Sequence, residues 1–378
     1  MIRIKQFLIY FAIILQFLTA LSTGEYVCAV DNKNLTSAES MITIEAKTGR
    51  VLYSKNEHKK LPMASTTKIL TAIVAIESVE DLDLVYEVPK EAVGIEGSSI
   101  YLKVGEHLSI RELLYGLMLR SGNDAAVAIA ILVAGSVDKF VKNMNEFCDE
   151  LGLKNTNIVT VSGLHHDDHY TTASDLAKIT ARAFENDIFA EIVRTKNISI
   201  SNEFDDKNKC RFLKNKNKLL SKVEGADGVK TGYTKKAGRC FVGSALRDGM
   251  RIICVLLNCG PMFEDCDRLL EKAFNEFKLV KVFNEGAYSI SGNEKTQNNL
   301  IIIEKDIYYP LKNDEIVKIY GKLNLGTIKK EEKKEKRSLC KLELYLENNL
   351  IFSTKVITIN TESINGVEDT LNKILKAF

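Results

Sequence analysis

The chain has 378 residues, of which 45% are hydrophobic and 27% charged, and only 4 are Pro. At about 150 residues per domain this length predicts two or three domains, and the near-average apolar content excludes a mainly disordered chain. A formal net charge of +2 gives no strong electrostatic attraction to nucleic acid, and 5 His residues leave few candidates for imidazole chemistry.

The first 29 residues follow the order of a secretory signal peptide. Arg3 and Lys5 precede an apolar run over residues 7–21 that is too short to span a bilayer comfortably, and Val27-Cys28-Ala29 supplies a small-x-small cleavage pattern. We expect cleavage after Ala29 and export, so that the mature chain is extracytoplasmic, at the cell surface or associated with the membrane. An uncleaved N-terminal anchor is the alternative.

Of the 8 Cys residues, Cys28 leaves with the signal, and the odd number that remains contains no C-x-x-C pair. Zinc ribbons and thioredoxin-like sites therefore have no support. Cys240, Cys254 and Cys259 lie in apolar, strand-like segments and are predicted to be small buried hydrophobes. We expect a fold that does not depend on disulfides, which suits a bacterial surface in a low-oxygen setting.

The predicted elements begin with a β-hairpin over residues 40–53, where alternating apolar residues turn at Lys47-Thr48-Gly49. Pro62 and the polar Ser65-Thr66-Thr67 then open a helix to about Ser78, which has almost no polar face and is therefore predicted to be buried.

Further helices come before the next strands. The pattern Ser109-x-x-Glu112 is a capping box and begins a helix to about Leu119. Two helices, two strands and a closing helix are predicted next, over residues 125–134, 137–151, 239–247, 250–259 and 265–277. Because helices lie between an N-terminal hairpin and late antiparallel strands, we predict an α+β catalytic domain over residues 30–280, with an antiparallel sheet flanked by helices.

Only short strands are predicted beyond this domain, over residues 299–308, 315–325, 338–347 and 350–359, with the mixed-charge segment 329–337 as a loop. Their spacing predicts a small C-terminal all-β sandwich over residues 284–361. Residues 363–378 have apolar side chains at three- and four-residue steps and are predicted to form an amphipathic helix, too short to cross a bilayer. This helix either makes a peripheral membrane contact through its apolar stripe or packs on its own β-domain.

The first of three chemical motifs is Ser65-Thr66-Thr67-Lys68. Lys68 follows Ser65 by about one helical turn, so its amine is expected beside the Ser65 hydroxyl. A serine hydroxyl attacks a carbonyl only when a base removes its proton, and a lysine buried in an apolar helix can act as that base because desolvation lowers its pKa. The motif predicts Ser65 as nucleophile and Lys68 as base; S-x-x-K alone would favour a helix N-cap followed by an ordinary lysine.

The second motif, Ser121-Gly122-Asn123, stands in the break between two predicted helices. A Ser121 hydroxyl between two lysine amines could relay a proton to the leaving group, and the Asn123 amide can bind a backbone carbonyl of a substrate. Alone, these letters fit a plain turn. They recur at Ser291-Gly292-Asn293, where we predict such a turn.

The third motif, Lys230-Thr231-Gly232, opens a predicted strand. On an edge strand, Lys230 can hold a substrate carboxylate, Thr231 can donate a hydrogen bond, and Gly232 leaves room for a peptide to lie alongside as an added strand. The backbone N–H groups of Ser65 and Tyr233 would then form an oxyanion hole.

In this order and spacing the motifs resemble those of the penicillin-recognising serine acyltransferases. The chain resembles in particular the low-molecular-mass penicillin-binding proteins, which are serine D-alanyl-D-alanine carboxypeptidases. The stretches LPMASTTKILTA, YLKVGEHLSIRELLYGLMLRSGNDAA and GVKTGYTKKAGRCFVGSA carry the resemblance. It covers about residues 30–278 and extends less specifically to the β-domain; a His is common in this family where Ser162 stands.

The resemblance implies a transpeptidase-like fold, covalent β-lactam binding at Ser65, and removal of the terminal D-alanine from peptidoglycan stem peptides that end in D-Ala-D-Ala. Ser65, with Lys68 as base, would form an acyl-enzyme that water then hydrolyses. Lys230 and Thr231 would hold the terminal carboxylate while Ser121 helps to protonate the departing D-alanine. We expect no cofactor and no metal.

Several alternatives share some of these features. A DD-endopeptidase and a β-lactamase of the same superfamily carry the motifs, although such β-lactamases usually have Asp where Gly122 stands and lack the β-domain. A non-catalytic β-lactam-sensing or wall-binding module would need inert lysines. A metal-dependent peptidase would use the loop residues His165, His166, Asp167, Asp168 and His169, but consecutive residues rarely converge on one ion.

Overall fold

The structure is a computed structural model that describes residues 35–204, 209–289, 299–324 and 337–360. The predicted signal peptide, the second Ser-Gly-Asn turn and the predicted tail helix lie outside these residues. The chain divides into two compact units, with the boundary between Lys278 and Leu279.

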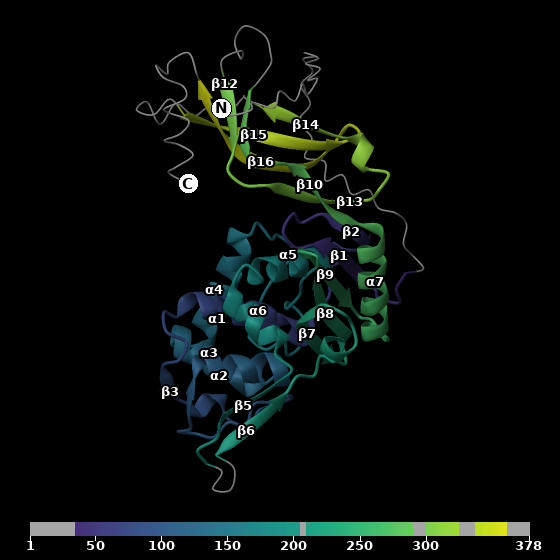
Figure 1. The fold of residues 1–378 in the computed structure, drawn as a ribbon. Coiled ribbons are helices and arrows are strands. Elements are labelled where there is room, and N and C mark those ends of the chain that lie inside the picture. The colour runs from purple at the N-terminus through teal and green to yellow at the C-terminus, as the bar shows by residue number, and fades with distance from the viewer. Residues whose placement is uncertain (1–34, 205–208, 290–298, 325–336, 361–378) are drawn as a thin grey trace. The chain divides into compact units, whose positions relative to one another are not determined.

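A five-stranded sheet with the strand order β2-β1-β9-β8-β7 forms the centre of the larger unit (Figure 1). Its strands, antiparallel at every pairing, are β1 (Ser40–Glu45), β2 (Val51–Lys55), β7 (Ala226–Thr234), β8 (Gly238–Arg247) and β9 (Met250–Leu257). The N-terminal hairpin pairs with a late strand, and Thr43 lies opposite Cys254. This pairing leaves β7 at an edge of the sheet, as the third motif requires.

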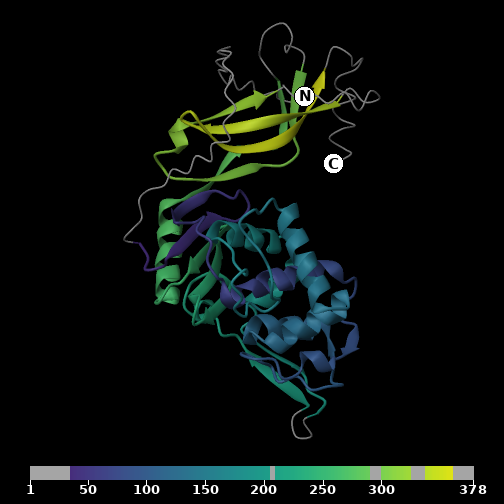
Figure 2. The same ribbon diagram turned by 180° about the vertical axis from the view of Figure 1, so that it is seen from behind.

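Helices cover both faces of the sheet (Figures 1 and 2). Helix α7 (Met262–Glu276) packs on β8 and β9, while α5 (Ala173–Ala183) and α6 (Asp187–Arg194) pack on the other face. The remaining helices of this unit are α1 (Lys68–Ser78), α2 (Ile110–Tyr115), α3 (Asn123–Ala134) and α4 (Val137–Glu150). The predicted α+β fold is therefore confirmed.

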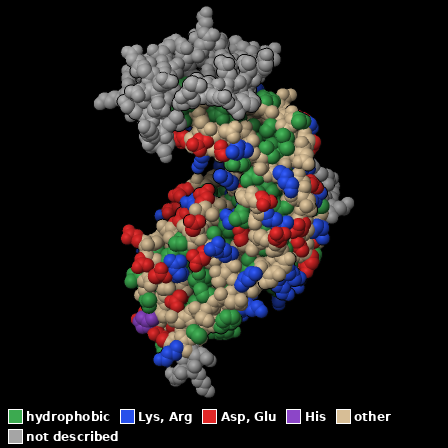
Figure 3. Space-filling view, in the orientation of Figure 1, with side chains coloured by type: hydrophobic (Ala, Val, Ile, Leu, Met, Phe, Trp, Pro, Cys, Tyr) green, Lys and Arg blue, Asp and Glu red, His purple; other side chains and the backbone are tan. Residues whose placement is uncertain are grey.

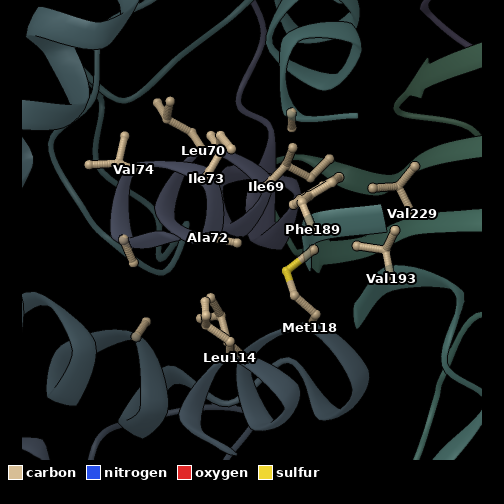
Figure 4. Close-up of a cluster of buried hydrophobic side chains, with 14 of the residues drawn as sticks. Ile69, Leu70, Ala72, Ile73, Val74, Leu114, Met118, Phe189, Val193 and Val229 are labelled. Carbon is tan, nitrogen blue, oxygen red and sulfur yellow. The ribbon is translucent and has the colours of Figure 1, made fainter. Parts of the chain in front are cut away.

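Helix α1 lies at the centre of the helical layer, and every residue from Lys68 to Ile76 is buried. Figure 4 shows Ile69 and Ile73 among side chains from α2, α6 and β7. Burial of each large aliphatic side chain contributes about 1.5–3 kcal/mol, so the helix is a rigid support for the residues at its N-terminus.

The start of α1 differs from the sequence prediction. A 3₁₀ turn, η1 (Ala64–Thr67), comes first, and the α-helix begins only at Lys68. The hydroxyls of Thr66 and Thr67 donate to the carbonyls of Met63 and Ala64, at 2.6 and 2.8 Å. These bonds to the residue three positions back stabilise the tighter turn, so the predicted helix does open at Ser65-Thr66-Thr67, but its first turn is a 3₁₀ turn, which a hydrophobic pattern does not distinguish from an α-helical one.

The predicted capping box at α2 is confirmed. The Ser109 hydroxyl accepts from the Glu112 N–H at 3.2 Å, and a Glu112 carboxylate oxygen accepts from the Ser109 N–H at 2.9 Å. The helix continues as a π-helical turn, η3 (Gly116–Arg120), and stops where Ser121 takes a left-handed conformation with φ 65°. The second motif therefore begins at a chain reversal, with α3 starting at Asn123.

Several short elements of this unit were not predicted from the sequence, including α5 and α6. The others are the two-stranded pairs β3 (Val85–Glu87) with β4 (His107–Ser109) and β5 (Asn197–Ser201) with β6 (Cys210–Lys214), and the 3₁₀ turns η2 (Lys90–Ala92) and η4 (Lys218–Ser221). The paired strands and the 3₁₀ turns have only three to five residues each, which leaves too little periodicity to detect, whereas α5 and α6 have 11 and 8 residues and were simply missed.

The smaller unit is a two-layered β-structure, which confirms the predicted sandwich. One layer has the strand order β11-β12-β16-β15-β14 and the other is β10-β13. The strands are β10 (Lys278–Phe283), β11 (Gly286–Ser289), β12 (Asn299–Ile303), β13 (Ile307–Leu311), β14 (Ile319–Asn324), β15 (Arg337–Leu346) and β16 (Asn349–Asn360), with a 3₁₀ turn, η5 (Ile316–Lys318), before β14. Tyr309 and Leu311 of β13 pack on Leu344 of β15 between the layers.

One predicted strand of this unit, residues 299–308, is in fact two strands in different layers. The break falls at residues 304–306, where the Asp306 carboxylate accepts from the Glu285 N–H at 2.8 Å and pairs with Lys281 at 2.6 Å. Because these partners lie about twenty residues earlier, the break could not be seen in the local pattern.

The surface charges and the cysteines are distributed as the sequence predicts. On the face of the larger unit shown in Figure 3, acidic and basic side chains are interspersed. Cys240, Cys254 and Cys259 are buried free thiols, as predicted. In the described part of the chain, no helix is both long enough and apolar enough to cross a membrane.

Candidate active site

The structure brings the three motifs together. The Lys68 amine lies 3.0 Å from the Ser65 hydroxyl and donates to the Asn123 side-chain oxygen at 2.7 Å. A Cβ atom placed on Gly232 would lie 3.0 Å from the Ser65 nitrogen. Edge strand β7 therefore passes directly beside the turn that carries Ser65, and only a glycine at position 232 allows this approach without displacement.

Lys68 is completely buried, and it contacts three oxygens: the Ser65 hydroxyl, the Asn123 side-chain oxygen and, at 2.6 Å, the backbone carbonyl of Ser162. Burial, reinforced by the positive charges of Lys230 and Lys216, lowers the pKa of Lys68 well below its usual value; the Asp124 carboxylate acts in the opposite direction. The amine is therefore easily deprotonated.

The contacts of Lys68 determine where the lone pair of the neutral amine points. The Ser162 carbonyl can only accept a hydrogen bond, and the Asn123 oxygen is an acceptor because the same amide donates through Nδ2 to the Glu96 carbonyl at 2.6 Å. These two acceptors take the two N–H bonds of a neutral amine. The lone pair is left for the third partner, the Ser65 hydroxyl, which is the arrangement that a general base needs.

Lys230 is the second buried lysine, with 2% of its surface exposed. Its amine donates to the Thr231 carbonyl at 3.0 Å, and it forms no ion pair with any residue that the structure describes. Burial and then the charge of Lys216 lower the pKa of Lys230 to about 7. An unpaired, buried cation on an edge strand is suited to bind an anion.

Ser121 is 5% exposed and lies between the two helical segments, but its hydroxyl has no hydrogen-bond partner within the described ranges. Its role as a proton relay stays a prediction. The same holds for the roles of Asn123 and Thr231 in substrate binding and of the Ser65 and Tyr233 N–H groups as an oxyanion hole. Tyr233 pairs with Arg239 of β8, and its side chain is 65% exposed.

His169, which the metal-peptidase alternative would use as a ligand, instead packs against the 3₁₀ turn that carries Ser65. The ring of His169 is buried; its Nε2 atom lies 2.8 Å from the Thr67 hydroxyl, and its Nδ1 atom accepts from the Val159 N–H at 3.0 Å. Because the Thr67 hydroxyl donates to the Ala64 carbonyl, Nε2 carries the ring hydrogen. Burial, then the neighbouring His166 and His165, lower the pKa of His169 to about 4. His169 is thus a neutral residue that supports the 3₁₀ turn carrying Ser65.

The rest of that histidine cluster points elsewhere. His165 and His166 are exposed and lie 3.3 and 3.9 Å from the carboxylates of Asp167 and Asp168. Within the described residues, no three His, Cys, Asp or Glu side chains are grouped so that they could hold a metal ion. The geometry gives the metal-peptidase alternative no support.

Sequence reasoning missed three contributors to this site: the Ser162 carbonyl, the Asp124 carboxylate and Lys216. Asp124 accepts from the N–H groups of Ile100 and Leu102, at 3.0 and 3.2 Å, and so holds the loop beside Asn123. A backbone carbonyl has no residue-type signature. The position of Asp124 next to the Ser-Gly-Asn motif was the only available signal.

Gly163 is expected to be essential for the geometry of the nucleophile turn. It has φ +81°, and a Cβ atom there would lie 1.9 Å from the Ala64 carbonyl oxygen and 2.9 Å from the Ser65 nitrogen. Gly163→Ala must displace this backbone, and a misplacement of about 1 Å can cost on the order of 10²-fold in rate. Rates of acylation by a fluorescent penicillin would measure the loss.

Gly135→Ala is the matched control, because Gly135 has φ +80° and nothing within 4 Å of an added Cβ. It carries the same left-handed strain, about 1–2 kcal/mol, without the collision. We expect it to lower stability and leave acylation unchanged. Equal acylation rates for both variants would contradict the role given to Gly163.

Comparisons with known proteins identify the family of the chain. A family model described as D-alanyl-D-alanine carboxypeptidase matches residues 28–260, and the chain belongs to this family. The D-alanyl-D-alanine carboxypeptidase DacF of Bacillus subtilis is 34% identical over 253 residues, which cover 65% of this chain and 64% of the relative. The chain thus matches less than two thirds of the length of that curated relative.

Two solved structures show the same fold. The Streptomyces K15 DD-transpeptidase has a TM-score of 0.59 and 32% identity, covering 64% of this chain and 98% of its own. Penicillin binding protein 6B from Escherichia coli has a TM-score of 0.66 and 26% identity, and it covers 85% of this chain and 95% of its own. The second comparison extends the similarity beyond the larger unit.

Proposed function

We propose that the protein is a serine DD-carboxypeptidase that removes the terminal D-alanine from peptidoglycan stem peptides ending in D-Ala-D-Ala. The observation that carries this proposal is the buried Lys68 amine, whose lone pair is directed to the Ser65 hydroxyl by two fixed acceptors. Membership of the D-alanyl-D-alanine carboxypeptidase family supports the choice of substrate.

In the proposed reaction Lys68 takes the Ser65 proton as the Ser65 oxygen attacks the carbonyl carbon between the two D-alanines. The backbone N–H groups of Ser65 and Tyr233 stabilise the oxyanion, and the C–N bond then breaks. The departing D-alanine amine receives a proton through Ser121. The Ser65 ester that remains is hydrolysed by water, which restores the hydroxyl and releases the shortened peptide.

Edge strand β7 positions the substrate in this proposal. A peptide that lies antiparallel to β7 adds a strand to the sheet, with its carboxylate near Lys230 and Thr231. β-Lactams enter the same site and acylate Ser65. Their carboxylate takes the place of the substrate's terminal carboxylate.

The proposal includes an extracytoplasmic location, supported by the signal-peptide pattern of residues 1–29 and by the substrate, which belongs to the cell wall. The apolar stripe predicted for residues 363–378 adds a peripheral membrane contact. Cell fractionation shows where the protein is located, and N-terminal sequencing shows whether residues 1–29 have been removed. Recovery of the protein in the cytoplasmic fraction with residues 1–29 still attached would contradict both the extracytoplasmic location and the membrane contact.

The direct test uses purified protein and a synthetic acyl-D-Ala-D-Ala peptide. We expect release of one D-alanine per peptide, blocked by prior treatment with benzylpenicillin, and a penicillin adduct on Ser65 that lasts minutes or longer. Rapid hydrolysis of penicillin without D-alanine release would favour the β-lactamase instead. Cleavage of a cross-linked dimer but not of the linear peptide would favour the endopeptidase.

A further inference from the structure

An irregular segment, residues 158–164, carries the backbone carbonyl that contacts the base. The Ser162 carbonyl accepts from the Lys68 amine at 2.6 Å, and the preceding carbonyl, that of Val161, accepts from the Thr71 hydroxyl of α1 at 2.7 Å. A carbonyl outside a helix or strand has no backbone ladder to fix its position, so the groups around it must do so. The position of the Ser162 carbonyl therefore depends on what holds this segment.

His169 joins this segment to the turn at the start of α1. Its Nδ1 atom accepts from the N–H groups of Val159 and Thr160, at 3.0 and 3.3 Å. Its Nε2 atom donates to the Thr67 hydroxyl at 2.8 Å. Because Thr67 directly precedes Lys68, one ring bridges the residue before the base and the segment that carries the acceptor of the base.

The hydrogen bonds of Thr160 extend this bridge past Ser162. The Thr160 hydroxyl accepts from the Gly163 N–H at 3.2 Å and donates to the Leu164 carbonyl at 3.1 Å. Ser162 therefore lies inside a turn whose two sides are tied through Thr160, and the backbone of Thr160 is tied to the imidazole ring. A shift of the ring would move the Ser162 carbonyl relative to the Lys68 amine.

A neutral imidazole meets both demands because it has a hydrogen-bond donor on one edge and an acceptor on the other. Burial lowers the pKa of His169 to about 4, so the ring stays neutral at a pH of about 7 and keeps one nitrogen as an acceptor. The backbone beyond the ring is held as well, since Tyr170 and Thr171 exchange hydrogen bonds with Asn157 and Leu61, at 2.9–3.1 Å. The ring therefore has a fixed position and a fixed hydrogen-bonding direction.

We propose that His169 is a positioning residue for acylation, which fixes the Ser162 carbonyl on the Lys68 amine and thereby keeps the lone pair of that amine directed to the nucleophile. This inference rests on the proposed function and on the role of Lys68 as its base. It assigns the orientation of the base to a residue outside the three motifs, which acts through a backbone carbonyl and not on the substrate.

Three substitutions separate the two sides of the bridge. His169→Gln places an amide near Nε2 and can keep the bond to Thr67, His169→Asn places an amide oxygen near Nδ1 and can keep the bond to Val159, and His169→Phe retains a ring without either bond. We expect His169→Phe to lower the acylation rate per active site by up to about 10²-fold, the cost of a misplacement of about 1 Å. Each amide variant should recover part of this loss. The concentration of fluorescent penicillin that gives the half-maximal rate should not change.

Counting the labelled sites distinguishes positioning from folding. The final number of labelled sites per chain measures the folded fraction, whereas the time course measures the rate of each site. A merely structural residue would change the first and the melting temperature, and a positioning residue changes the second. Combination with Lys68→Met gives another readout: because His169 acts through the Lys68 amine, His169→Phe should cost nothing more in that background.

His166→Phe is the matched control. His166 lies three residues earlier in the same loop, its Nδ1 atom also accepts a backbone N–H, that of Asp168 at 3.1 Å, and its ring is exposed. This variant should acylate at the rate of the unaltered protein. An unchanged rate per site in His169→Phe, or a loss that persists in full in Lys68→Met, would overturn the inference. In either case acylation and D-alanine release by the unaltered protein still support the proposed function, whereas their absence there would refute that function itself.

Discussion

Ser65→Ala is expected to abolish both D-alanine release and covalent labelling by a fluorescent penicillin. The hydroxyl is the only group of this side chain that can form an acyl-enzyme, and no other hydroxyl lies within hydrogen-bond distance of the Lys68 amine in the described part of the chain. Loss of the nucleophile in a serine protease costs on the order of 10⁶-fold in rate. Gel fluorescence after penicillin treatment, together with a D-alanine assay, measures both effects.

Ser78→Ala gives the control on the same helix. Ser78 closes α1, and its hydroxyl donates to the Val74 carbonyl at 2.7 Å, far along the helix from the nucleophile turn. Labelling and activity of this variant should match those of the unaltered protein. Labelling that persists in Ser65→Ala would show that the acylated residue has been misassigned.

Lys68→Met is expected to lower the rate of acylation on the order of 10²- to 10⁴-fold, the usual contribution of a general base. Methionine is unbranched and of similar length, so it fits a site that is 0% exposed. The variant loses hydrogen bonds to Asn123 and Ser162 but is also free of the desolvation cost of a buried amine. We therefore expect it to remain folded, as circular dichroism would show.

The pH dependence gives a second readout of the same base. Lys68 must be neutral to accept the Ser65 proton. Acylation by the unaltered protein should therefore be slow below the lowered pKa of Lys68 and should become faster as the pH rises through that pKa. On the alkaline side, Lys230 loses its charge above its pKa of about 7, and the binding of carboxylate compounds should weaken. Lys68→Met should lack the acid limb.

Lys178→Met serves as the control for the charge change, since Lys178 is exposed on α5. It should retain the rate and the pH profile of the unaltered protein. If Lys68→Met acylated at the same rate as this control, Lys68 would not be the base and the proposed mechanism would be wrong.

The sequence alone determined the residue types of the site, the class of fold and the family, because these depend on local signals. The spacing of Ser65 and Lys68, the capping box at Ser109 and the alternation of the late strands are all read within a few residues. Each of these features reflects hydrogen bonds or burial within one helix or strand, and these are determined largely by the neighbouring residues in the sequence.

Only the tertiary structure decided the direction of the Lys68 lone pair, the neutral state of His169 and the position of Lys216. These depend on the Ser162 carbonyl, on burial and on charges from other elements, none of which leaves a pattern in the adjacent sequence. A pKa and a hydrogen-bond direction are set by everything packed around a group, so they became visible only when segments far apart in the chain were folded against one another.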